Sequence, residues 1–153
     1  MAKSHYQPLF LLLASLLFLP ALHAVDFKYC NGIGYVDKIT KVEISPDDPS
    51  TVITISGLTR RGLVYAGTVV VASGIGEFNI PFKYYDFCQL CKCPMLSGTN
   101  FVFTLSQILI PKAFASDKLA VTLSLISRDQ TEGVCVYFDF PTSANSMLNQ
   151  ASE

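Results

Sequence analysis

Three of the five cysteines of this chain lie within six residues, in the segment Tyr85–Leu96, which reads YDFCQLCKCPML. Thiol groups at this spacing can bind a metal ion, cycle between thiol and disulfide, or form a structural disulfide bond. Cys88, Cys91 and Cys93 are therefore the first residues whose role the rest of the sequence must decide.

The metal and redox interpretations each lack a part that they need. A four-thiolate shell would take its fourth ligand from Cys30 or Cys135, but the second C-x-x-C pair that structural zinc sites normally carry is missing. A thioredoxin-like pair of Cys88 and Cys91 belongs at the N-terminus of a helix, and we expect strand and turn on both sides of it. The cluster therefore favours a structural disulfide, and we predict no metal ion and no cofactor.

The N-terminus predicts the compartment in which these cysteines meet. Lys3 and His5 precede an apolar run, Leu9–Leu19, which is followed by Pro20 and small residues ending at Ala24. This pattern is typical of a secretory signal peptide, and the run is shorter than the roughly 20 apolar residues of a membrane-spanning helix. We predict that residues 1–24 are removed and that the protein enters the secretory pathway, to be secreted or held in the lumen of the endoplasmic reticulum or vacuole.

An oxidising compartment makes disulfide bonds the expected state of the cysteines. A bond between Cys30 and Cys135 would close a loop of more than 100 residues, which the chain-entropy model values at about 4–5 kcal/mol. For the second, local bond we favour Cys88 with Cys93 over Cys88 with Cys91. Cys91 is then a possible free thiol.

The composition argues against an enzyme and against a nucleic-acid partner. Both histidines, His5 and His23, lie within the predicted signal peptide, so the mature chain has no imidazole for a nucleophile–histidine pair or a histidine-bearing zinc site. The net charge is −1, and the basic residues are scattered. We predict a non-enzymatic protein with no catalytic residue and no nucleic-acid partner.

The mature sequence shows alternation typical of strands and no apolar stripe at helical spacing. Turn-forming residues separate seven expected strands: 36–44, 51–58, 63–73, 76–84, 101–106, 118–127 and 134–140. This pattern predicts an all-β fold, an immunoglobulin-like sandwich of two sheets over residues 25–140. Residues 141–153 are small and polar and are expected to be a flexible tail.

Apolar residues make up 50% of the chain, with eleven Phe and no Trp. The inward rows of the strands could form a solid core, or they could line an apolar cavity between the sheets, because small-molecule sites are concave and mostly apolar. The residues that we expect on such a cavity are Ile53, Ile55, Val69, Val71, Phe101, Phe103, Leu105, Val121, Leu123, Val136 and Phe138. Arg60, Arg61 and Lys83 could meet an anionic headgroup, although solvated surface charge is their default interpretation.

The cysteine positions and two long segments resemble those of the ML domain, the MD-2-related lipid-recognition family that includes the Niemann–Pick type C2 sterol carrier. The resemblance rests on FCQLCKCP, GTNFVFTLSQILIP and KLAVTLSLISRDQTEGVCVYFDF, and it covers the mature chain from Asp26 to Phe140. It is strongest with the small secreted plant members described as phosphatidylglycerol/phosphatidylinositol transfer or sterol-binding proteins.

The resemblance implies two sheets that separate to hold a lipid, with no enzymatic step. It also implies a bond between Cys30 and Cys135 and a local bond between Cys88 and Cys93. It places Phe101 and Phe103 at the cavity, with Val121, Leu123 and Val136 on strands that line it. Cys91 has no counterpart in the family pattern, and the extra early disulfide of the animal sterol carrier is absent here.

We therefore expect a protein that sequesters a sterol or a phospholipid and carries it through transient contact with membranes. The alternative is a secreted immunoglobulin-like interaction module with a solid core and no ligand. The sequence indicates no protein partner, and it does not choose between the two lipid classes.

Overall fold

The computed structural model describes residues 23–47, 50–60, 62–74, 79–109, 118–128 and 131–140. The predicted signal peptide, apart from its last two residues, and the predicted tail lie outside these residues. The described elements are β1 (His23–Ala24), β2 (Phe27–Tyr29), β3 (Lys38–Asp47), β4 (Ser50–Leu58), β5 (Val64–Ser73), β6 (Ile80–Asp86), α2 (Phe87–Leu90), β7 (Asn100–Ile108), β8 (Lys118–Ser127) and β9 (Thr131–Asp139).

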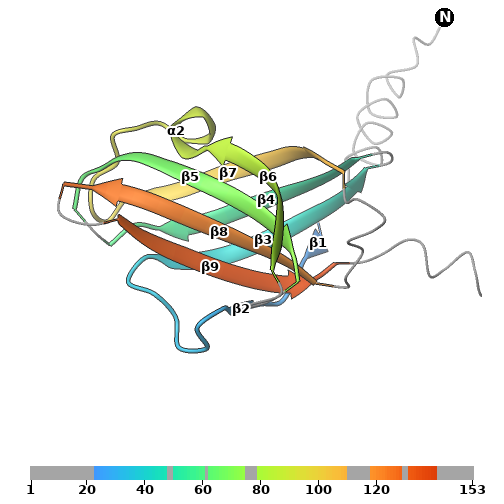
Figure 1. Ribbon diagram of the computed structural model, residues 1–153. Coiled ribbons are helices and arrows are strands. Elements are labelled where there is room, and N and C mark those ends of the chain that lie inside the picture. The colour runs from blue at the N-terminus through green and yellow to red at the C-terminus, as the bar shows by residue number, and fades with distance from the viewer. Residues whose placement is uncertain are drawn as a thin grey trace, which may run out of the picture.

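The described strands form two antiparallel sheets that pack face to face as a sandwich (Figure 1). One sheet has the order β1-β3-β4-β7 and the other has the order β2-β9-β8-β5-β6. The all-β, two-sheet architecture predicted from the sequence is thereby confirmed. Among the described residues, no helix is long and apolar enough to cross a lipid bilayer.

Alternation along the strands explains why the sheets pack in this way. On β8, Leu119, Val121, Leu123 and Leu125 are buried, while Thr122 and Ser124 between them are only partly covered. Successive strand residues point to opposite faces of a sheet, so each strand contributes one apolar row to the inner face of its sheet. The inner faces of the two sheets together form the core. The bounds of β8 are those expected from the sequence.

The structure corrects the expected surroundings of the cysteine cluster. Cys88 lies in the one-turn helix α2, where strand and turn were expected. The Asp86 carboxylate caps this helix by accepting a 2.8 Å hydrogen bond from the backbone N–H of Cys88. β6 also extends two residues beyond the predicted strand, to Asp86, while residues 76–78 of that prediction lie outside the described residues.

Two disulfide bonds fasten the sandwich. Cys30 bonds Cys135 across a sequence separation of 105, next to the pairing of β2 with β9. Cys88 bonds Cys93 and ties α2 to the loop that follows it, and Cys91 is a free thiol. These are the pairings that the sequence analysis favoured, and they suit a protein that folds in an oxidising compartment.

Candidate functional site

The interior between the sheets is walled by the eleven residues predicted to line a cavity. β4 and β7 contribute five of them, with Ile53 opposite Leu105 and Ile55 opposite Phe103. β5, β8 and β9 contribute the other six from the facing sheet. Each of the eleven is at most 4% exposed, and all belong to one apolar cluster. The structure therefore brings the whole predicted set together, on both walls of one interior.

Three phenylalanine rings form one end of this interior. Phe101 and Phe103 of β7 stack with their centroids 6.0 Å apart. Phe87 of α2 meets both rings edge-on, at 5.9 and 5.8 Å. Edge-to-face and offset contacts between aromatic rings stabilise their packing, in addition to the free energy gained by burying their surface. Phe87 was not among the predicted site residues, because its inward direction depends on the helical turn that the sequence pattern did not reveal.

A hollow of about 510 Å³ lies outside the three rings, between the α2–β7 loop and the start of β7. We call it the β7 hollow. Its lining residues are Leu90, Cys91, Lys92, Pro94, Met95, Leu96, Thr99, Asn100, Phe101 and Val102. Met95 and Phe101 are about 5% exposed and also belong to the core, whereas Leu96 and Val102 are more than 60% exposed. The hollow thus reaches from an open rim to the wall of the interior.

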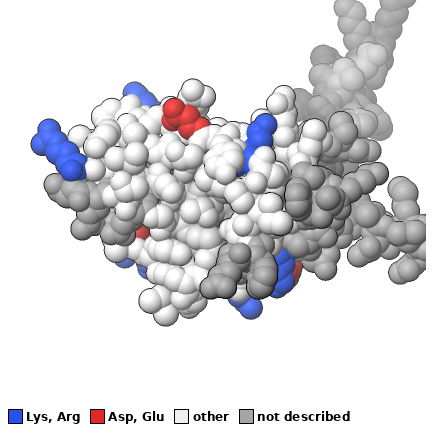
Figure 2. All heavy atoms as spheres, viewed as in Figure 1, with Lys and Arg blue, Asp and Glu red and all other residues white. Residues whose placement is uncertain are grey.

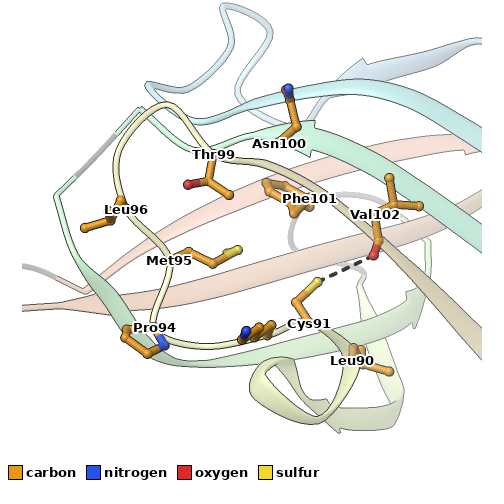
Figure 3. A pocket seen from close by; sticks show the side chains of 10 residues that line it. Leu90, Cys91, Pro94, Met95, Leu96, Thr99, Asn100, Phe101 and Val102 are labelled. Atoms are coloured by element: carbon orange, nitrogen blue, oxygen red, sulfur yellow. Dashed lines mark hydrogen bonds between the residues drawn. The ribbon is translucent and has the colours of Figure 1, made fainter.

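The close view shows how the lining residues divide between floor and rim (Figure 3). The Met95 side chain extends toward the Phe101 ring, while Leu96 points away from it. Backbone hydrogen bonds fix Met95, because its N–H and carbonyl both pair with Val64 of β5, at 2.8 and 2.9 Å. A volume of about 510 Å³ falls within the range of small-molecule sites, roughly 300–1,000 Å³.

Cys91 lies in the wall of the β7 hollow, where its free thiol is partly buried. Its Sγ is 3.7 Å from the Val102 carbonyl oxygen, which accepts a weak hydrogen bond from the thiol. Burial raises the pKa of Cys91, so the reactive thiolate is scarce at neutral pH. Among the described residues, no group of three His, Cys, Asp or Glu side chains could hold a metal ion.

At one side of the sandwich, edge strand β6 of one sheet faces edge strand β7 of the other. Tyr85 of β6 crosses this side and donates a 2.8 Å hydrogen bond from its hydroxyl to the Ser106 carbonyl oxygen. Burial raises the pKa of Tyr85, which keeps this donor protonated. Lys83 stands beside it, with its Nζ 5.7 Å from the centre of the Tyr85 ring. Arg61, the neighbour of Arg60, lies outside the described residues.

Sequence comparisons place this architecture among known proteins. The ML domain family matches residues 24–142 of the chain. MD-2-related lipid-recognition protein 3 of Arabidopsis thaliana is 35% identical, over 97% of this chain and 99% of the relative. The MD-2-related lipid-recognition protein ROSY1 of the same plant is 34% identical over the full length of both chains. With its disulfide-tied sandwich and its apolar interior, this chain belongs to the ML domain family.

Proposed function

We propose that this protein binds one lipid molecule, a sterol or a phospholipid, with its apolar part between the sheets, and carries it between membranes. The observation that carries the proposal is the continuity of the interior with the β7 hollow, through Met95 and Phe101. Both relatives are named for lipid recognition, and that name agrees with an interior lined by apolar side chains.

The physical basis of carriage is sequestration rather than chemistry. Each CH₂ group moved from water into an apolar interior contributes about 0.8 kcal/mol, so a single acyl chain or sterol skeleton supplies enough free energy for retention. The two sheets are separate hydrogen-bonded ladders, so they can move apart without breaking strand pairing. Uptake needs Phe101 and Met95 to shift, because together they lie between the β7 hollow and the rest of the interior.

The rim of the β7 hollow carries polar groups that can contact the polar end of the lipid, a sterol hydroxyl or a phospholipid headgroup. Lys92, Thr99 and Asn100 line it, and an ammonium, a hydroxyl and an amide can donate hydrogen bonds to a sterol hydroxyl or to a phosphate. A phosphate would gain more from Lys92, because a hydrogen bond between two charged groups is stronger. The lipid class is therefore a question of which headgroup the rim selects.

Native mass spectrometry of the secreted protein, after exposure to a mixed sterol and phospholipid extract, tests the proposal. We expect one adduct of lipid mass per chain, and organic extraction then identifies its class. Phe103→Asp places a charge in the interior and should abolish the adduct. Thr104→Asp is the matched control, because Thr104 follows Phe103 on the same strand but is exposed and does not line the β7 hollow, so its adduct should persist.

The experiment remains decisive if aspartate at position 103 prevents folding. Phe103→Ala removes a ring without adding charge and should shift retention toward bulkier lipids. A folded wild-type protein that retains no lipid of any class would contradict the proposal and would favour a solid-core interaction module.

A further inference from the structure

Three loops meet at one end of the sandwich and are joined to one another by hydrogen bonds. They are residues 31–37, residues 59–60 and residues 92–99, and we call them the loop platform (Figure 1). The Arg60 N–H donates to Asp37 Oδ1 at 2.7 Å, and Ser97 Oγ donates to the Arg60 carbonyl at 2.9 Å. The Gly98 N–H also donates to the Thr59 carbonyl at 2.7 Å. The platform is thus a connected surface rather than three independent loops.

The first loop exposes an isoleucine side chain to solvent. Ile33 is 92% exposed. The Asn31 side-chain oxygen accepts hydrogen bonds from the N–H groups of Ile33 and Gly34, at 3.2 and 2.9 Å, and its amide donates to the Gly34 carbonyl. Gly32 and Gly34 adopt positive φ angles of 75° and 96°, which allow the tight turn. An ordered turn with an aliphatic side chain at its tip is suited to insertion into an apolar phase.

Two more exposed aliphatic side chains lie on the platform, one from the first loop and one from residues 92–99. Val36 is 53% exposed and precedes Asp37, which binds Arg60. Leu96 is 66% exposed and begins the turn closed by the hydrogen bond from the Thr99 N–H to the Leu96 carbonyl. Leu96 also lines the β7 hollow, so the platform is continuous with the rim of the candidate lipid site.

The exposed charge of the platform is positive. Arg60 and Lys92 are exposed, and Lys38, the first residue of β3, is exposed beside them. Among the described residues of the three loops, the one carboxylate is that of Asp37, which is 2% exposed. Figure 2 shows Lys and Arg side chains projecting from this end, at the left of the view. A surface that exposes both aliphatic side chains and cations complements an anionic lipid surface, where the aliphatic side chains enter the headgroup region and the cations meet phosphates.

We propose that the loop platform is the surface by which this protein docks on bilayers that contain anionic phospholipid. This inference rests on the proposed carrier function. It adds which surface of the protein faces the membrane when the lipid enters or leaves. Docking here would bring the rim of the β7 hollow against the membrane, so that a lipid could move between bilayer and interior with little exposure to water.

The absence of tryptophan from the chain allows a direct test. Leu96→Trp puts a fluorescent reporter on the platform, and Leu109→Trp puts one at the other end of β7. The two leucines are matched, being 66% and 65% exposed. With vesicles of phosphatidylcholine and phosphatidylglycerol, the emission of Leu96→Trp should shift to shorter wavelength and that of Leu109→Trp should not. Vesicles of phosphatidylcholine alone should give a weaker response.

Affinity measurements on the same vesicles separate the two contributions. Lys92→Gln should weaken binding about fivefold, the effect of one cation near an anionic surface, while Lys28→Gln on β2 should not change it. Ile33→Asp should weaken binding about tenfold or more, because an aliphatic side chain that enters the bilayer is replaced by a charge.

Lipid retained by each variant, measured by extraction, distinguishes failure of docking from failure of carriage. A protein that retains lipid but shows equal shifts, or none, at positions 96 and 109 would overturn the docking surface and leave the carrier function intact. A platform-specific shift in a protein that retains no lipid would support the docking surface and contradict the carrier function.

Discussion

At the scale of single residues, Cys91 shows how burial decides what a thiol can do. Its burial favours the neutral thiol in the folded state and raises its pKa. Iodoacetamide should therefore label one thiol per chain, more slowly at neutral pH than in the chain unfolded by urea with its disulfides intact. Labelling should accelerate only as the pH rises through this raised pKa. Cys91→Ser should abolish the signal, and fast labelling at neutral pH would contradict the assignment of a partly buried, protonated thiol.

The same raised pKa fixes the sign of its contribution to stability. Below the ordinary pKa of cysteine, Cys91 is protonated in both folded and unfolded chains. Above it, the unfolded chain loses the proton first, so stability falls as the pH rises toward the pKa of the folded state. Tyr85, whose pKa is raised for the same reason, acts in the same direction at still higher pH.

Gly57 is a residue whose small size positions the aromatic site. A Cβ at this position would lie 2.3 Å from the Phe101 ring and 2.7 Å from the Lys38 carbonyl oxygen. The ring could shift but the backbone oxygen is held in the sheet, so Gly57→Ala should destabilise the protein by about 1–3 kcal/mol. Gly62→Ala is the control, because a Cβ there meets nothing within 4 Å. Urea unfolding of the two variants checks this, and equal midpoints would refute the close approach.

At the scale of elements, the two disulfide bonds differ in what they constrain. The bond Cys30–Cys135 closes a loop of about 100 residues, worth about 4.7 kcal/mol on the chain-entropy model, whereas Cys88–Cys93 closes a short loop worth about 2 kcal/mol. Replacing Cys30 and Cys135 by alanine should therefore lower the free energy of unfolding more than replacing Cys88 and Cys93.

The short bond instead should matter for the site. It holds α2, and with it Phe87, against the loop that carries Met95. We compare how much lipid retention each variant loses with how much its free energy of unfolding falls. For the same fall in that free energy, the Cys88→Ala, Cys93→Ala variant should lose more lipid retention than the variant that lacks the bond Cys30–Cys135. Urea unfolding measured beside lipid extraction tests this order, and the reverse order would show that the β7 hollow does not depend on α2.

Seven of the nine described strands and their inward rows could be predicted from the sequence, because alternation is a local signal that each strand carries by itself. β1 and β2 were missed, since two and three residues are too few to show alternation. Val121 and Leu123 are recognisable as one face without knowledge of their partners. The one-turn helix could not be found in this way, since four residues are too few for a helical stripe. The β7 hollow was missed because it depends on how the α2–β7 loop packs against Val64, a contact distant in sequence.

At the scale of the whole molecule, an apolar interior has polar side chains at its margins. The two sheets contribute facing apolar rows, while the loop platform carries Lys92 and the β6–β7 side carries Lys83 and the Tyr85 hydroxyl. A lipid has the same division between an apolar body and a polar end. The molecule therefore complements a lipid as a whole, which a single residue or strand cannot do.

This complementarity predicts that lipid binding stabilises the entire sandwich. A ligand that binds only the folded state, at 100 times its dissociation constant, adds about 2.7 kcal/mol, which corresponds to a rise of about 10 °C in Tm for a domain of this size. Thermal unfolding with and without the lipid identified by extraction measures this rise. Thr104→Asp should keep it, because that side chain is exposed and lies outside both the interior and the β7 hollow. Folded Phe103→Asp should lose it, and an equal rise in both variants would mean that the lipid binds the surface and that the interior does not hold it.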